Sequence, residues 1–170
     1  HLRPYVQMVM ADQSRNVPKP SSKTNEKLLF LRENMTHLTN QLSMPVIEVA
    51  LVVSKFIRIV LESLENAAKL SGEELPSSVS RKKPLDSHSP EENSFDVIQS
   101  FPLEKLIERV DNDRMDILDT LIRNVVNESE LEFVHVLGEL RQWEHNIREQ
   151  LSTVVSPGGL FSPLELPEDF

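Results

Sequence analysis

Glu132 and His135 have the metal-ligand spacing that stands out most in this chain, because residues three apart project from one helix face. Di-iron bundles use two such pairs and two further glutamates, and this chain has no second Glu-x-x-His. The run that starts at Asp111 begins like a calcium loop, but Met115 and Asp116 stand where a ligand and a glycine are needed. We therefore expect no metal site and a helix-surface or boundary position for His135.

Motifs for nucleophilic or phosphate chemistry are absent from the sequence. The chain has no cysteine, which excludes disulfides, thiolate zinc sites and cysteine nucleophiles. Its 4 glycines form none of the patterns GxGxxG, GxxxxGK[ST] or GxSxG. We expect a protein that is not an enzyme and that has no cofactor and no small-molecule substrate. A helical-bundle enzyme or metal carrier is kept as a third hypothesis, because a catalytic triad need not show in sequence spacing.

Three Ser-Pro dipeptides fall in segments that we expect to be loops. They place Ser89, Ser156 and Ser162 before prolines, as in sites of proline-directed phosphorylation. A phosphate there would add negative charge beside Glu91 or beside an acidic tail. These serines are the modification sites that the sequence offers.

Charge is unevenly spread along the 170 residues, whose formal net charge is −9. Residues 1–71 hold 9 basic and 6 acidic side chains, whereas residues 96–155 hold 6 basic and 13 acidic ones. Overall acidity argues against direct nucleic-acid binding through a basic face. Two interpretations follow: the two halves sit together and partly neutralise each other, or the acidic second half meets a basic partner.

Apolar residues three and four apart predict two helices in the first half. One begins at Thr24 or Asn25 and ends or kinks at Met44, since the proline that follows removes a backbone donor. The next runs from Pro45 to about Leu70 and is apolar nearly all round in its first four turns, so it must be central to the fold or covered by another chain. The pattern leaves open whether the two helices fold back or form one kinked helix.

Two more helices are expected in the second half. One spans about 102–126, and Asp111-Asn112-Asp113 interrupts its apolar stripe and is a candidate break. The other begins at Ser129, which forms a capping box with Glu132 three residues later, and ends near Ser156. The turn between the two is very short, which predicts an antiparallel arrangement.

These helices predict an all-α fold, either a four-helix bundle or two helical hairpins with coiled-coil-like packing, joined by a long crossover linker. No membrane span is expected, because the longest apolar run has 16 residues and includes charges. The organisation comprises an extended head, a first helical pair, a flexible linker, a second helical pair and an acidic-hydrophobic tail: residues 1–22, 23–71, 72–95, 96–155 and 156–170.

Large apolar side chains are the candidate contacts, either within the fold or with a partner helix. Trp143 is a candidate interface anchor or a partly covered flank residue, and the tail either docks into a partner groove or packs back onto the bundle. The residues predicted to bind a partner are Leu31, Leu38, Val49, Val53, Phe56, Val60, Trp143, Phe161, Leu164 and Phe170. The second half is predicted to pack through Leu121, Phe133, Leu140 and Ile147.

We therefore expect a non-enzymatic helical module for protein–protein interaction, a scaffold subunit or fragment of a larger intracellular complex. It would bind protein partners or self-associate through apolar helices, in the nucleus or the cytoplasm. The alternative is a phosphorylation-regulated, transcription-linked or signalling adaptor that acts through the linker and the tail.

Overall fold

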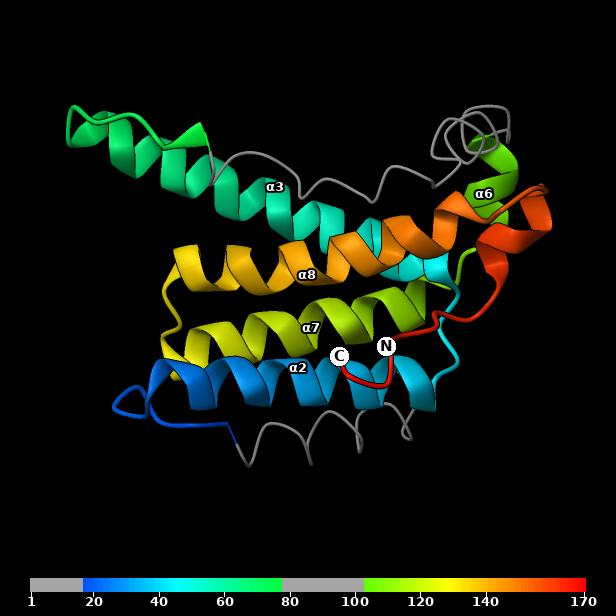
Figure 1. Ribbon diagram of the computed structural model, residues 1–170, viewed down its shortest axis with the longest axis horizontal. Helices are drawn as coiled ribbons and strands as arrows, with labels where there is room; N and C mark the ends of the chain where they lie inside the picture. The colour runs from blue at the N-terminus through cyan, green and yellow to red at the C-terminus, as the bar shows by residue number, and fades with distance from the viewer. Residues whose placement is uncertain (1–16, 78–102) are drawn as a thin grey trace.

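The protein is all-α, with four main helices packed as a bundle, as the spacing of its apolar residues predicts (Figure 1). The computed structural model describes residues 17–77 and 103–170. Pro45 and Pro163 form an isolated antiparallel bridge in this described part. The elements are α2 (Thr24–Gln41), α3 (Val46–Leu70), α6 (Leu103–Arg109), α7 (Asn112–Ser129), α8 (Phe133–Ser152) and the 3-10 helix η1 (Pro157–Phe161).

The two halves of the chain pack mainly against each other. The principal packing pairs are α3 with α8 and α2 with α7, and α3 also contacts α7 while α2 contacts α8 (Figure 1). Helices α7 and α8 are antiparallel, as the short turn predicts, but each one covers a helix of the first half. Neither half therefore builds the core alone, and of the two architectures considered from the sequence the bundle is the one observed.

The core follows the apolar stripes of the sequence. Leu31, Met35 and Leu38 lie one turn apart on α2 and are fully buried, and Leu121 and Leu140 from the second half belong to the same buried cluster. Burial of side chains of this size contributes about 1.5–3 kcal/mol each before conformational entropy is counted. The stripes therefore account for why these segments form helices in this arrangement.

The break between α2 and α3 separates them into two helices that run in opposite directions (Figure 1). Ser43 has a positive φ of 47°, and the Met44 amide donates to the Thr39 carbonyl. Pro45 is the N-cap of α3 and not its first helical residue, so the helix begins at Val46, one residue later than the sequence predicts. The question left open by the sequence is thus answered, since the chain folds back at Met44–Pro45.

The interruption at residues 111–113 is a true break, as expected. Asp111 ends the connection after α6 and caps α7, and its carboxylate accepts from the backbone N–H groups of Asp113 and Arg114. An aspartate in this position satisfies donors that have no partner inside the helix.

The predicted capping box at Ser129 is wrong. Helix α7 continues to Ser129, whose hydroxyl donates to the Val125 carbonyl one turn earlier. Glu130 then takes a left-handed conformation, and α8 starts at Phe133 after Glu132 without a side-chain cap. The Ser-x-x-Glu spacing fits the capping-box pattern, but the Ser129 hydroxyl bonds to a carbonyl of the preceding helix and so cannot cap the next one.

Two aromatic residues lie differently from the sequence interpretation. Trp143, expected to be at most partly covered, has no exposed surface. Phe133, expected in the packing stripe of the second half, is 38% exposed because it is the first residue of α8 at the end of the bundle. The 16 residues that precede the described part, most of the 72–95 linker and Ser89 lie outside the described residues.

Helix α3 changes character along its length. Most apolar side chains of its first four turns are buried, but Leu51 is 38% exposed and Ser54, Lys55 and Arg58 are exposed, so one side of the helix is open and it is not covered all round as the sequence predicts. Its last turns carry Leu61 and Leu64 half-buried and Leu70 91% exposed. The helix has 25 residues against 20 in α8, which at 1.5 Å per residue makes it about 7 Å longer. None of the described helices is both long enough and apolar enough to cross a membrane.

Candidate functional site

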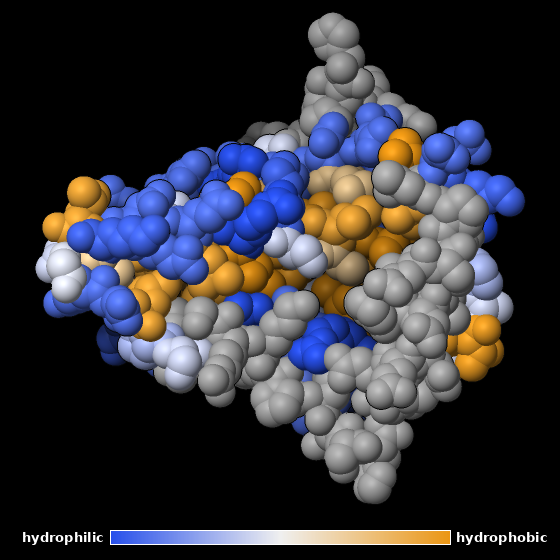
Figure 2. Space-filling view, turned by 90° about the horizontal axis from the view of Figure 1, so that it is seen from above, coloured by the Kyte–Doolittle hydropathy of each residue, from blue (hydrophilic) through white to orange (hydrophobic). Residues whose placement is uncertain are grey.

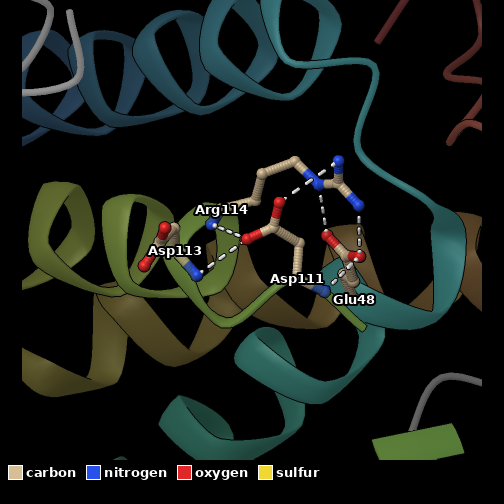
Figure 3. A network of polar contacts seen from close by, with 4 residues as sticks. All are labelled: Glu48, Asp111, Asp113 and Arg114. Atoms are coloured by element: carbon tan, nitrogen blue, oxygen red, sulfur yellow. Dashed lines mark hydrogen bonds and ion pairs between the residues drawn. The ribbon is translucent and has the colours of Figure 1, made fainter. Parts of the chain in front are cut away.

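An ion pair between a buried carboxylate and a half-buried arginine joins α3 to the start of α7 (Figure 3). Glu48 has no exposed surface, and its two carboxylate oxygens accept from Arg114 Nε at 2.9 Å and Nη2 at 2.7 Å. The Asp111 backbone N–H donates to the same carboxylate at 3.0 Å. The hydrogen bonds from Arg114 to Glu48 raise the pKa of Arg114 above its ordinary value, against a smaller lowering by burial. A two-point guanidinium contact fixes geometry as well as charge, so this network sets how α7 meets α3.

A second network joins α2 to α8. Arg32 donates from Nε and Nη2 to the two oxygens of Glu139, at 2.9 and 2.8 Å. The Trp143 indole N–H donates to the same carboxylate at 3.0 Å, so this buried tryptophan has a partner for its one polar atom. The hydrogen bonds to Glu139 raise the pKa of Arg32. A residue of the basic first half is thus paired with one of the acidic second half.

Phe170 covers this network from outside. Its ring meets the Trp143 ring edge-on with centroids 5.0 Å apart, and the Arg32 guanidinium lies 4.9 Å from its centroid. Arg32 therefore contacts an anion on one side and an aromatic face on the other.

A third polar cluster lies on the surface between α3 and α7. Lys55 Nζ donates to Asp119 at 2.6 Å, and Arg123 pairs with the same carboxylate. Partial burial alone would raise the pKa of Asp119, but the hydrogen bonds from Arg123 and Lys55 outweigh it and hold that pKa below its usual range. The guanidinium of Arg123 also lies 5.1 Å from the Phe56 ring centroid.

The tail packs back onto the bundle, which answers the second question left open by the sequence. The Val46 amide at the start of α3 donates to the Ser162 carbonyl at 2.8 Å, and the Leu164 amide donates to the Met44 carbonyl at 2.9 Å. The Gln150 side chain donates to the Pro163 carbonyl at 3.0 Å and accepts from the Glu165 amide at 2.8 Å. We call the surface formed by Met44, Pro45, Val46 and Gln150 the tail groove.

Side chains anchor the tail between these backbone contacts. Leu160 is 1% exposed and Leu164 7% exposed, and both belong to the buried cluster of the bundle. The Arg109 guanidinium lies 3.8 Å from the centroid of Phe161, so α6 also contacts the tail. Among the residues described, Ser156 and Ser162 are exposed.

An open hollow lies where the end of α3 diverges from α8. We call it the α3–α8 hollow, and it is lined by Ser54, Ile57, Arg58, Leu61, Glu62, Glu65, Arg141 and Glu144. Arg141 Nη1 donates to Glu144 at 2.8 Å, so the α8 side is a neutralised pair, whereas Glu62 and Glu65 are exposed on the α3 side. Seen from above, hydrophobic residues gather in the middle of the face, and hydrophilic residues lie along one side of them (Figure 2).

The residues predicted to bind a partner lie mostly inside this bundle. The structure brings together Leu31, Leu38, Val49, Val53, Phe56 and Val60 in the core, with Trp143 and Leu164 also buried and Phe161 and Phe170 half-buried. Their role in contacting a second protein stays a prediction. In the described ranges 17–77 and 103–170, no three His, Asp or Glu side chains lie together as metal ligands would. His135 is exposed, 3.8 Å from Glu132.

The residues whose hydrogen bonds join the two halves and the tail are not among those predicted from the sequence. One signal was available: Glu48 is a lone acid near the start of an apolar helix, and a charge in that setting must find a partner. Nothing in the spacing points to Arg114, to Gln150 or to Arg32, since their partners lie 66, 13 and 107 positions away.

Comparison of the chain with family models, with curated proteins and with solved structures finds no match.

Proposed function

We propose that this chain is a non-enzymatic module for protein–protein interaction, a scaffold element of a larger intracellular assembly in the nucleus or the cytoplasm. Its four helices form a fixed frame, and a partner binds on surfaces that the frame leaves open.

The observation that carries the proposal is the α3–α8 hollow together with the free end of α3. The apolar residues that line the hollow are Ile57, which is buried, and Leu61, which is half-buried; Leu64 is half-buried one turn further along α3. An apolar strip bordered by charge is the usual composition of a recognition surface, with a polar rim around contacts that exclude water. The exposed Glu62 and Glu65 favour a partner with basic residues beside its apolar contacts.

Charge reversal on the rim tests the proposal without disturbing the core. The double variant Glu62→Arg with Glu65→Arg changes only exposed side chains, and Glu73→Arg with Glu74→Arg is a matched control just past the end of α3. Proteins retained from cell extract by the immobilised wild-type chain should also be retained by the control and lost with the double variant. Equal retention by all three chains would contradict the proposal for this surface.

A phosphorylation-regulated adaptor is the second candidate, and the position of Ser162 favours it. Its exposed side chain follows η1, and its own carbonyl accepts from the first amide of α3. A helix N-terminus favours negative charge, so a phosphate on Ser162 would hold the tail in place. Ser156 is also exposed but precedes η1, and its carbonyl bonds within the tail to Gly159. Phosphopeptide mapping after incubation with a proline-directed kinase should find phosphate on Ser162, and its absence would remove this candidate.

A further inference from the structure

The tail is held as a protein holds an extended peptide. Two tail carbonyls and two tail amides bond to the groove, through the Val46 amide, the Met44 carbonyl and both ends of the Gln150 amide. Backbone contacts of this kind do not read the sequence of the bound segment, whereas side-chain pockets at intervals do. Here the buried anchors are Leu160 and Leu164, four residues apart with Pro163 between them.

The connection between α8 and the tail is mostly exposed, although Val154 within it belongs to the buried cluster. Helix α8 ends at Ser152, and the connection that follows contains Val155, which is 85% exposed. Beyond it the tail has only the five-residue η1 as regular structure. When the tail leaves, the Val46 amide at the helix start and the Gln150 side chain lose their partners, so the groove keeps donors and acceptors aimed at a main chain.

We infer that the tail groove is a recognition site for an extended Leu-x-x-Pro-Leu segment of another protein, and that this chain's own tail covers the site until such a segment displaces it. The inference rests on the proposed interaction function but uses a different surface from the α3–α8 hollow. The tail itself, from Leu160 to Leu164, shows which pattern fits.

Competition explains why the partner is a different protein and not a second copy. A tail attached through a short connection has an effective concentration on the order of 1 mM at its own groove. The tail of a second copy makes the same contacts without that advantage, so it loses to the attached tail at ordinary concentrations. A foreign segment with additional contacts can overcome the difference.

The test measures binding of a labelled peptide with the sequence of residues 157–166 to the full-length chain by fluorescence anisotropy. The opened variant carries Leu160→Ser with Leu164→Ser, which removes the tail's anchors and leaves the groove unchanged. We expect this variant to bind the peptide at least about tenfold more tightly than the wild-type chain does. If the double variant lacks the helical circular dichroism of the wild type, Leu164→Ala takes its place.

Two matched changes identify the contacts. Gln150→Ala in the opened variant should weaken peptide binding about tenfold, because two hydrogen bonds are lost. Glu62→Arg with Glu65→Arg should leave peptide binding unchanged, so failure of the hollow as a partner surface remains distinguishable from failure of the groove.

Several outcomes would overturn the inference. These are a folded opened variant that does not bind the peptide, equal binding by the opened and wild-type chains, or binding that Gln150→Ala does not change. A wild-type dimer seen by light scattering and lost in the opened variant would assign the groove to a second copy, and would also overturn it.

Discussion

The helical bundle and the docked tail bury leucines to a similar extent but are held in different ways. Leu121 in α7 is 4% exposed and Leu164 in the tail 7%. Leu121 belongs to a helix that packs on two others and is tied to α3 by the ion pair of Arg114 with the buried Glu48 carboxylate. Leu164 belongs to the tail, whose main chain makes two hydrogen bonds to backbone groups and two to the Gln150 side chain, and which follows a mostly exposed connection. Burial of an anchor therefore does not by itself make a segment part of the cooperative core.

The largest expected effect is on the bundle side of this comparison. Arg114→Ala should lower the free energy of unfolding by about 3 kcal/mol, because it leaves the fully buried Glu48 carboxylate without its counter-charge. Urea denaturation followed by circular dichroism measures the change. Arg123→Ala is the matched control, since its exposed pair with Asp119 is worth less than about 1 kcal/mol. Equal losses of unfolding free energy in the two variants would contradict the stabilising role given to the Arg114–Glu48 pair.

A smaller effect is expected on the tail side. Leu164→Ala should cost about 2 kcal/mol, at the low end for a buried leucine, because the site lies at the edge of the core. The loss should appear as faster hydrogen exchange at the amides of Val46 and Leu164, with little change inside α7. Leu70→Ala, at a residue 91% exposed, should change neither. A uniform increase in exchange across the bundle would show that the tail is part of the core.

Acid should weaken the α3–α7 contact through Asp119. Because the folded state holds the pKa of this carboxyl below its usual value, its contribution is complete above about pH 4 and is lost as the pH falls through the lower folded pKa. Asp119→Asn should therefore be less stable than wild type at pH 7 by less than about 1 kcal/mol, with the difference shrinking below pH 4. Urea midpoints at pH 7 and pH 3 measure it, and a difference that grows on acidification would contradict the sign.

The smallest effect distinguishes the two described Ser-Pro serines. Ser162→Glu places a negative charge beside the start of α3. It should raise the free energy of opening the tail by a few tenths of a kcal/mol and so slow exchange. Ser156→Glu should leave the opening unchanged. Exchange at the Leu164 amide measures both variants, and a faster rate in Ser162→Glu would reverse the proposed effect of phosphorylation.

The sequence predicts what depends on neighbouring residues and misses what depends on distant ones. Spacings of three and four residues locate the main helices, and Asp111 marks a break that the structure confirms. The capping box at Ser129 fails because the Ser129 hydroxyl bonds backward into α7. The burial of Trp143 depends on Glu139 and Phe170, and the latter comes from a tail whose docking no local pattern specifies.

Native-state hydrogen exchange at Leu164 and Leu121 in low concentrations of urea tests most directly whether the tail is a separable occupant of its groove. We predict that the Leu164 amide, which donates to the Met44 carbonyl, exchanges by a small opening that urea does not accelerate. The Leu121 amide should exchange only by global unfolding, with a rate that rises steeply with urea. If both amides show the same opening free energy and the same urea dependence, the tail unfolds with the bundle and the account is contradicted.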